Sequence, residues 1–550
     1  MLAAMSLPPT TTPSGDETPV RGRDDACPGA LRLHPADDGS LARIRVPGGL
    51  LTARQAQALG RVAEELGDGR LDITSRGNLQ VRGLDAGCGA ELAARLRAAG
   101  LLPSDRHDRV RNIVASPLSG LDGEGHADVV AWVRELDAAL CDDAPAGDGK
   151  LSGLSGRFLF ALDDGRGDVA TLGADVTLIA TPDGGAVLRV GGPPPGPGVP
   201  SPSTAGTAYP DAAARRGSPR AGSAAGGGLR VRSEDAPRAA ALAAVEFLAK
   251  AHESGTRAWR VRELPARHAV TTEGLAARLA DAGVEAVPME HEPAPRARAT
   301  PPAPGPVPGP NGRHALSVAL PLGRVSAAQW RLLAGLASRS GAAELRMTPW
   351  RGVVLPGFAP DDTRGALSEL SDAGLVTTPD SPWLGVGACT GRPGCAKSLA
   401  DVRADTARMV ADTARGATDP ARGTSGTARG AANAVGVDAG GAKPWPVSGT
   451  AYGGGPAGPD PLPVYVSGCE RRCGHPGGRW VDALATGDTD YRVTVRGARG
   501  DTPEADSTDS ADSTDSADST DSADSTGSAD SVDVTAEQLA GAVAAARGTT

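Results

Sequence analysis

The chain has 550 residues, enough for about three or four domains. Its 75 glycines and 46 prolines are concentrated in a few segments that lack the apolar residues a core needs, so the folded part is shorter. A formal net charge of −10 argues against a nucleic-acid partner, and no apolar run approaches the roughly 20 residues of a membrane span. Because the residues near Met1 lack the features of a secretory signal, we expect a cytoplasmic protein with reduced thiols.

The first ordered part of the chain alternates strand and helix patterns. Residues 39–46 alternate apolar and polar side chains, as a half-buried strand does. Thr52 precedes an apolar stripe over residues 53–66 and predicts a helix with a capped start. A second strand is predicted at 71–81 and a second helix at 90–99.

The same arrangement returns in the second half of the chain. Thr52 and Thr74 lie 22 positions apart, and so do Ser326 and Thr348. Chance agreement between such turn and capping residues is uncommon, so we predict two copies of one α+β unit. The second strand of the later copy is expected at 344–355.

Composition divides the rest of the chain into ordered domains and inserts. Pro/Gly/Ala/Ser-rich and acidic low-complexity stretches are expected to be flexible or disordered. The predicted segments are a disordered arm at 1–25, the first unit at 26–105, an α/β domain at 106–292 with a flexible insert at 191–228, a linker at 293–312, the second unit at 313–383, a four-cysteine domain at 384–498 with a flexible insert at 413–460, and an acidic low-complexity tail at 499–550. In the α/β domain, helices are expected near 127–140 and 236–253, with strands at 157–162, 176–179 and 186–190.

Four of the seven cysteines form two close pairs on glycine-bearing loops. Cys389 and Cys395 are separated by five residues, and Cys469 and Cys473 by three. Such loops let sulfur atoms converge on the irons of a cubane, so the pattern predicts a 4Fe–4S cluster. A structural zinc site, a disulfide pair and free thiols remain as alternatives. The register of the two copies places Ala115 opposite Cys389, which predicts that only the second copy kept the cluster ligands.

The remaining cysteines and one histidine carry weaker signals. Cys27, Cys88 and Cys141 are unpaired in the sequence and are expected to be buried, inert thiols. His475 follows the last cysteine pair and is open to three roles, namely iron binding, hydrogen bonding or packing.

This pattern resembles the sulfite and nitrite reductase superfamily, and within it most closely the precorrin-3B synthases. The resemblance implies an α+β fold with duplicated ferredoxin-like half-domains and two α/β domains of sulfite/nitrite reductase type, interrupted by disordered inserts. It also implies an oxygen-dependent monooxygenase that hydroxylates precorrin-3A with lactone formation in aerobic cobalamin biosynthesis, with a possible additional non-haem iron whose ligands the sequence does not identify. The motifs that carry the resemblance are Asp25-Ala-Cys-Pro-Gly29, Thr74-Ser-Arg-Gly-Asn78, Arg111-Asn112, the run Asn112 to Gly120, Cys389-Thr-Gly391 with Cys395, and Gly468-Cys469 with Cys473-Gly-His-Pro476.

Three arginines are candidates for substrate binding. Guanidinium groups stay charged and offer paired donors to carboxylates, and precorrins carry many acetate and propionate arms. Arg76 and Arg111 are therefore expected beside the substrate cavity, with an ordinary structural ion pair as the alternative role. Superfamily members that reduce sulfite carry a Lys-Phe-Lys stretch where this chain has Arg157-Phe-Leu159, so Arg157 can replace one lysine and Leu159 cannot replace the other.

Two other functions fit parts of the pattern. A sirohaem-dependent sulfite or nitrite reductase would use Cys473 to bridge the cluster and the haem iron. A non-catalytic electron carrier or tetrapyrrole-binding protein would bind without turnover. The chain shows no glycine fingerprint of a dinucleotide-binding fold, so a separate NAD(P)H-dependent reductase or electron carrier is expected as a partner, with precorrin-3A and dioxygen as substrates.

Overall fold

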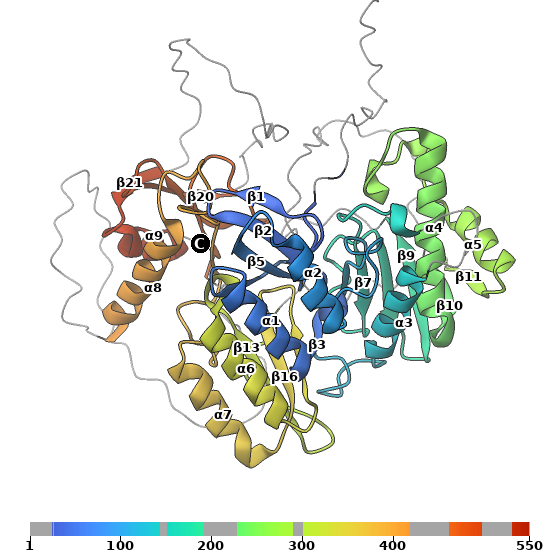
Figure 1. Cartoon of the computed structure of the whole chain (residues 1–550), viewed down its shortest axis with the longest axis horizontal. Helices are drawn as coiled ribbons and strands as arrows, with labels where there is room; N and C mark the ends of the chain where they lie inside the picture. Colours follow the sequence, from blue (N-terminus) through green and yellow to red (C-terminus); the bar gives the residue numbers. More distant parts are fainter. Residues whose placement is uncertain are drawn as a thin grey trace, which may run out of the picture.

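The computed structural model describes residues 25, 27–142, 151–191, 228–289, 301–418, 461–497 and 531–548. The arm expected at 1–25, the inserts expected at 191–228 and 413–460 and the low-complexity part of the tail lie outside the described residues, except at their edges. In Figure 1 the blue and yellow half-domain units lie between a teal and green α/β domain and an orange and red one. The predicted mixture of α and β structure is confirmed.

The first half-domain is a five-stranded sheet with two helices on its apolar face. Thr52 begins α1 as predicted, because its hydroxyl accepts a hydrogen bond from the Gln55 amide while the Gln55 side chain accepts from the Thr52 amide. The sheet has the order β1-β2-β5-β4-β14. Its elements are β1 (His34–Ala36), β2 (Gly39–Ile44), α1 (Ala53–Glu65), β4 (Arg70–Ile73), β5 (Leu79–Leu84), α2 (Gly89–Ala98) and, from the second copy, β14 (Arg324–Ser326).

The second half-domain repeats this arrangement. Ser326 and Gln329 form the same reciprocal cap at the start of α6. The sheet order is β12-β13-β16-β15-β3, so the later copy also takes one strand from the earlier one. Its elements are β12 (Gly305–Pro308), β13 (His314–Ala319), α6 (Ala327–Arg339), β15 (Glu344–Met347), β16 (Gly352–Phe358), α7 (Pro360–Asp372) and, from the first copy, β3 (Leu50–Thr52).

The single strands expected at 71–81 and 344–355 are each a hairpin, which corrects the prediction. The Thr74 amide donates to the Asn78 carbonyl at 2.8 Å, and the Thr348 amide donates to the Gly352 carbonyl at 2.9 Å. These bonds close tight turns between β4 and β5 and between β15 and β16. Apolar residues on both sides of each turn made the two short strands look like one.

The exchanged strands and one tryptophan lock the two half-domains together. Strand β3 pairs with β15, and β14 pairs with β4, both antiparallel. Trp330 of α6 is fully buried and its indole N–H donates to the Ala56 carbonyl of α1 at 2.7 Å. Residues of both copies therefore belong to one hydrophobic core, and neither half-domain is an independent unit.

The first α/β domain continues from the first half-domain. Its six-stranded sheet has the order β11-β10-β9-β8-β7-β6, in which β6, β7 and β8 are parallel. The helix expected at 127–140 and the strand expected at 157–162 are present, each shifted by about three residues at its start. The elements are β6 (Ile113–Ala115), α3 (Val130–Cys141), β7 (Phe160–Asp163), β8 (Val176–Ala180), β9 (Gly185–Val190), β10 (Leu229–Arg232), α4 (Ala236–Ser254), α5 (Thr272–Asp281) and β11 (Ala286–Pro288).

The second α/β domain contains the four cysteines and ends with part of the predicted tail. Its sheet has the order β17-β18-β19-β20-β21, and its first three strands are parallel. In Figure 1 its helices α8 and α9 lie on the same side of the molecule as this sheet. The elements are β17 (Val386–Ala388), α8 (Val402–Thr418), β18 (Val464–Ser467), β19 (Trp480–Ala485), β20 (Asp490–Arg496), β21 (Ser531–Thr535) and α9 (Leu539–Gly548).

Two predicted boundaries are corrected. The linker expected at 293–312 contains β12, an edge strand whose Pro306 and Pro308 misled the composition argument, although proline is tolerated at a sheet edge. The acidic tail expected from 499 ends in ordered structure, because β21 pairs with β20 and Leu539 and Val543 of α9 are buried in the core of the domain. Among the described residues, none of the helices has the length and apolarity that a membrane-spanning segment needs.

The two α/β domains share one local hydrogen-bond pattern after their first strand. The Ser116 amide donates to the Leu162 carbonyl, and the Cys389 amide donates to the Val466 carbonyl. The Ser116 hydroxyl accepts from the Asp164 amide at 3.1 Å, and the Cys389 sulfur accepts from the Gly468 amide at 3.2 Å. Ser116 is therefore the counterpart of Cys389, and the predicted counterpart, Ala115, is wrong by one residue.

Three aspartates lie beside Ser116. Carboxylate oxygens of Asp163, Asp164 and Asp168 lie within 4.8 Å of one another. Ser116 donates to Asp168 at 2.6 Å. Burial, and next the charge of Asp163, raise the pKa of Asp168 to about 7.

The pKa of Asp168 predicts how stability depends on pH. The folded-state value lies above the ordinary value of 3.8, so the folded protein retains a proton that the unfolded chain has lost. The free energy of unfolding should therefore fall as pH rises from about 4 to about 7, by at most about 4 kcal/mol for this group. We expect Asp168→Asn to flatten this decline in urea unfolding at pH 5 and pH 8, whereas the exposed control Asp281→Asn should keep it. Equal pH slopes in wild type and Asp168→Asn would contradict the assignment.

Candidate metal centre and arginine cluster

The four predicted cysteines converge at one edge of the second α/β sheet. Cys389 directly follows β17, and Cys469 follows the parallel neighbour β18, so both lie at carboxyl ends of strands. Burial raises the pKa of the Cys389 thiol against the lowering effect of hydrogen bonds from the Gly468 and Gly391 amides, and the charges of Cys469 and Cys395 add to the rise. Partial burial, and next the charges of Cys469, Cys389 and Cys395, raise the pKa of the Cys473 thiol. The charge effects connect all four cysteines, whose loops approach one another at this edge of the sheet.

Glycines make this convergence possible. The ideal Cβ position at Gly468 overlaps the side chain of Ser398, so any larger residue would push the two cysteine loops apart. Gly474, directly after Cys473, has φ 87° and lies against Tyr465. The Tyr465 hydroxyl donates to the Cys473 carbonyl at 2.5 Å, which fixes the second loop.

The spacing of the sulfur atoms distinguishes the kinds of metal that fit. A single tetrahedral zinc with Zn–S bonds of about 2.3 Å would hold its sulfurs about 3.8 Å apart. A cubane binds each thiolate at a different iron and holds the sulfurs farther apart. Four cysteine thiols are a donor set that both kinds of centre use.

The first half-domain holds the loop that carries Cys395. Arg82 of β5 forms a bidentate pair with Asp38, and its Nη2 also donates to the Gly394 carbonyl at 3.0 Å. Asp37 accepts from the Ala396 amide at 2.5 Å. The β1–β2 hairpin therefore positions a loop that lies more than 300 residues later in the chain.

His475 packs in this structure. Its ring stacks on Trp480 with the centroids 5.2 Å apart and an interplanar angle of 12°. Its Nδ1 lies 2.9 Å from the Pro476 carbonyl. Of the three roles that the sequence left open, packing and hydrogen bonding both have a visible contact among the described residues.

Arg76 and Arg157 meet at a loop of the first α/β domain. Arg76 follows β4, and its Nη1 lies 3.5 Å from the Gly156 carbonyl. The same carbonyl accepts from Nη2 of Arg45 at 3.1 Å. The guanidinium of Arg157 lies over the Trp259 ring, 4.8 Å from its centroid.

These residues belong to a cluster of arginines in which Arg45 is buried and Arg43 and Arg76 are half-buried. Burial, and next the charges of Arg260, Arg45 and Arg43, lower the pKa of Arg76 to about 9. Burial, and next the charge of Arg43, lower the pKa of Arg45 to about 10. Within the described part of the chain, no carboxylate lies within 4.0 Å of Arg43, Arg45 or Arg76. Arg43 Nε and Arg45 Nη1 are buried without a hydrogen-bond partner.

The nearby acids are occupied elsewhere. Asp108 accepts from the amides of Ala30 and Leu31. Asp25 accepts from the Cys27 and Gly156 amides and from Ser155. The charges of Asp25 and Asp108 still act on Arg45, but the three guanidinium groups of Arg43, Arg45 and Arg76 outnumber these two carboxylates, which leaves an excess of positive charge among the described residues. Cys27 is half-buried in this cluster and is not the fully buried thiol that was expected, and Cys88 and Cys141 are half-buried as well.

Arg111 lines a cavity of about 270 Å³ together with Arg45 of the cluster, but its donors are occupied. Its Nε and Nη2 bind the two carboxylate oxygens of Asp137 at 2.6 and 2.7 Å, and its Nη1 donates to the Leu101 carbonyl at 3.1 Å. The residue is 5% exposed. These contacts match the structural ion pair that was the alternative role for Arg111.

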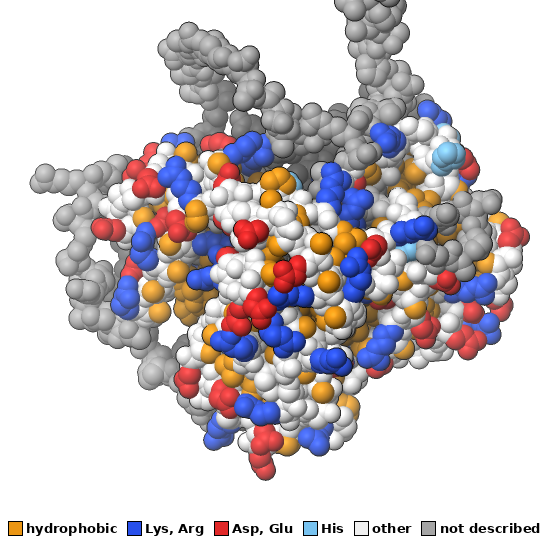
Figure 2. All heavy atoms as spheres, in the orientation of Figure 1, with side chains coloured by type: hydrophobic (Ala, Val, Ile, Leu, Met, Phe, Trp, Pro, Cys, Tyr) orange, Lys and Arg blue, Asp and Glu red, His pale blue; other side chains and the backbone are white. Residues whose placement is uncertain are grey.

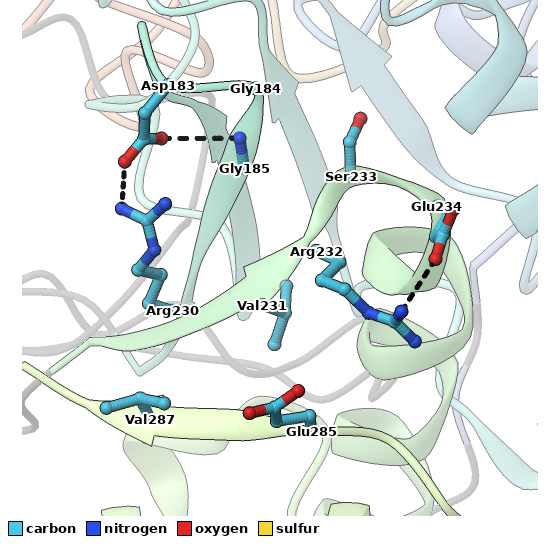
Figure 3. Close-up of a pocket in the computed structure, with 10 residues that line it drawn as sticks. All are labelled: Asp183, Gly184, Gly185, Arg230, Val231, Arg232, Ser233, Glu234, Glu285 and Val287. Carbon is cyan, nitrogen blue, oxygen red and sulfur yellow. Dashed lines mark hydrogen bonds and ion pairs between the residues drawn. The ribbon is translucent and has the colours of Figure 1, made fainter.

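Other charged features do not involve the predicted site residues. A surface cavity of about 400 Å³ lies over β9, β10 and β11, where Asp183 pairs with Arg230 and Glu234 pairs with Arg232 (Figure 3). Figure 2 shows basic and acidic side chains interspersed over the viewed face. The excess of positive charge therefore lies in the arginine cluster and not on the face that Figure 2 shows.

Comparison with known proteins identifies the half-domains. Residues 34–99 and 307–373 match the nitrite/sulfite reductase ferredoxin-like half domain. The ferredoxin–nitrite reductase of Synechococcus elongatus is 39% identical over 131 residues, which cover 23% of this chain and 25% of that protein. A precorrin-3B synthase from Sinorhizobium sp is 34% identical over 141 residues, which cover 26% of this chain and 29% of that protein. The aligned part is thus less than a third of the length of either relative.

Two further proteins match over a larger share of the chain. Sulfite reductase [ferredoxin] 2 of Mycolicibacterium paratuberculosis is 26% identical over 382 residues, covering 67% of this chain and 62% of the relative. The structure of the Mycobacterium tuberculosis NirA protein shares the fold with a TM-score of 0.56 at 20% identity, covering 83% of this chain and 74% of that one. The chain thus contains two half-domains of the nitrite/sulfite reductase type, and its similarity to these relatives supports the sulfite/nitrite reductase superfamily.

Proposed function

We propose that the protein is a precorrin-3B synthase in which Cys389, Cys395, Cys469 and Cys473 hold a 4Fe–4S cluster. The observation that carries this proposal is the excess positive charge of the arginine cluster. Burying an unpaired guanidinium is costly, so these groups favour an anion that brings its own negative charges. A precorrin, with many carboxylate arms on one macrocycle, supplies several such charges at once.

The reaction requires electrons from outside the chain. In a monooxygenation, one oxygen atom of dioxygen enters precorrin-3A as a hydroxyl, the other leaves as water, and two electrons and two protons are consumed. One of the substrate's own carboxylates then closes the lactone. A cluster held by Cys389, Cys395, Cys469 and Cys473 would supply one-electron transfer from an external reductase or carrier. The chain's arginines bind the carboxylate arms and orient the macrocycle.

A sirohaem-dependent sulfite or nitrite reductase is the second candidate, because several relatives carry those names. The loop around Arg157 speaks against it. Leu159 is fully buried in a small apolar cluster with Val114 and Ala161, so it leaves Arg157 as the cation of this short stretch. The second cation of the Lys-Phe-Lys stretch of sulfite-reducing members is therefore absent from this stretch.

Comparing the two reactions tests the proposal directly. Anaerobically purified protein with its cluster reconstituted would be given precorrin-3A, dioxygen and a reducing system, and in parallel sulfite or nitrite with reduced viologen. We expect a hydroxylated lactone by mass spectrometry and an absorption spectrum with broad thiolate-to-iron bands. A sirohaem Soret band with sulfite or nitrite turnover would favour the second candidate and refute the first.

The cysteine assignment predicts a selective loss of iron. A cubane needs one thiolate at each iron, so Cys→Ser at Cys389, Cys395, Cys469 or Cys473 should each lower iron and acid-labile sulfide sharply and reduce the electron paramagnetic resonance signal of the reduced protein. Cys88→Ser and Cys141→Ser are matched controls and should retain the wild-type content. A normal cluster in Cys389→Ser would refute the ligand set.

The arginine assignment predicts different effects at Arg76 and Arg111. Because a hydrogen-bonded charge is worth about 1.5–3 kcal/mol, Arg76→Ala should weaken precorrin binding roughly 10- to 100-fold and leave the cluster content unchanged. Arg157→Ala should act in the same direction. Arg111→Ala removes one partner of a buried pair and should instead lower the free energy of unfolding by about 3–5 kcal/mol. Titration of tetrapyrrole fluorescence and urea unfolding separate these outcomes, and unchanged affinity in both Arg76→Ala and Arg157→Ala would contradict the substrate role.

A further inference from the structure

Arg351 has a backbone conformation that usually belongs to glycine. It lies in the turn between β15 and β16 with φ 63°. The corresponding turn of the first copy, between β4 and β5, has Gly77 with φ 66° at the matching place. Left-handed backbone is unfavourable for a residue with a Cβ, so the second copy keeps an arginine where glycine fits without strain. Residues in such conformations tend to cluster at functional sites.

The side chain of Arg351 reaches both cysteine loops. A Cβ placed on Gly387, two residues before Cys389, would lie 3.9 Å from Nη1 of Arg351. A Cβ placed on Gly474, directly after Cys473, would lie 3.8 Å from Nη2. The guanidinium therefore lies between the two loops that supply the four thiols.

Gly323, directly before β14, leaves room for the Arg351 side chain. The ideal Cβ position at Gly323 lies only 2.6 Å from Cδ of Arg351 and 2.9 Å from Cγ. A larger residue at 323 would collide with the stem of the arginine. The direction of the side chain toward the cysteines is thus determined by packing as well as by its own backbone.

Arg351 also lacks an acidic partner. Within the described part of the chain, no carboxylate lies within 4.0 Å of its guanidinium, in contrast to Arg82, which pairs with Asp38. Arginine remains protonated at all ordinary pH values. A fixed positive charge therefore lies beside Gly387 and Gly474, which flank Cys389 and Cys473 in the chain.

We propose that Arg351 is a positioning residue that raises the reduction potential of the cluster. This inference rests on the proposed function, because it presumes that the four cysteines hold the cluster. When one electron enters from a reductant, the cluster and its four thiolates gain one unit of negative charge. A cation fixed beside them stabilises this reduced form more than the oxidised form, and net charge is one of the determinants of iron–sulfur potentials.

A redox titration of the full chain tests the proposal. Protein with reconstituted cluster would be titrated with dithionite and mediators, and the reduced form measured by electron paramagnetic resonance. We expect Arg351→Gln and Arg351→Gly to shift the midpoint potential to more negative values and Arg351→Lys to retain most of the wild-type value. The matched control is Arg339→Gln, because Arg339 is a surface arginine of the same half-domain that pairs with Glu369.

Arg351→Gly separates an electrostatic role from a structural one. It relieves the left-handed backbone of its side chain, so its thermal unfolding midpoint should equal or exceed that of the wild type while its potential falls. Wild-type potentials in both Arg351→Gln and Arg351→Gly would overturn the inference alone, and so would an equal loss in Arg351→Lys. A wild-type protein that takes up no cluster would overturn the proposed function, and this inference with it.

Discussion

The structure depends on the parallel pairing of β17 and β18. Parallel neighbours end at the same edge of a sheet, so Cys389 and Cys469 emerge side by side although 79 positions separate Cys389 from the Gly468 amide that it accepts from. That bond fixes the first sulfur, and Gly468 lets the loops approach. The Cys395 loop is then held from outside by Arg82 and Asp37 of the first half-domain. Residues of the first half-domain thus hold one loop of a candidate metal centre that lies in the second α/β domain.

Duplication followed by divergence explains the rest of the architecture. Both α/β domains keep the hydrogen bond from a strand-end amide to the first side chain after the preceding strand, with Ser116 in one copy and Cys389 in the other. In the first copy, Asp163 accepts hydrogen bonds from four backbone amides of its loop, from Gly165 to Ala170, and these bonds organise the loop. In the second copy, the corresponding loop after β18 carries Cys469. The arginine cluster lies in the half of the molecule that contains this first copy.

Much of this organisation was predictable from the sequence, because it depends on local signals. Thr52 and Ser326 begin helices as their capping patterns indicate, and the spacing of the cysteines predicts a shared site. Interactions between distant residues were not predictable. Nothing near Arg111 in the sequence indicates that Asp137, on a helix 26 positions later, occupies its donors. Strand β21 follows a long low-complexity stretch, and its order comes from the free edge of β20. The role proposed for Arg351 was missed, although comparing Gly77 with Arg351 between the copies would have shown the unusual substitution.

The central claim is that this protein uses its four-cysteine site and its arginine cluster to oxygenate a tetrapyrrole rather than to reduce a small anion. Turnover of precorrin-3A under ¹⁸O₂, with the product analysed by mass spectrometry, addresses it most directly. The account predicts that one ¹⁸O atom enters the tetrapyrrole product and that none enters from H₂¹⁸O at the hydroxylated carbon. A product without label from ¹⁸O₂, or no product while sulfite or nitrite is reduced by the same preparation, would contradict it.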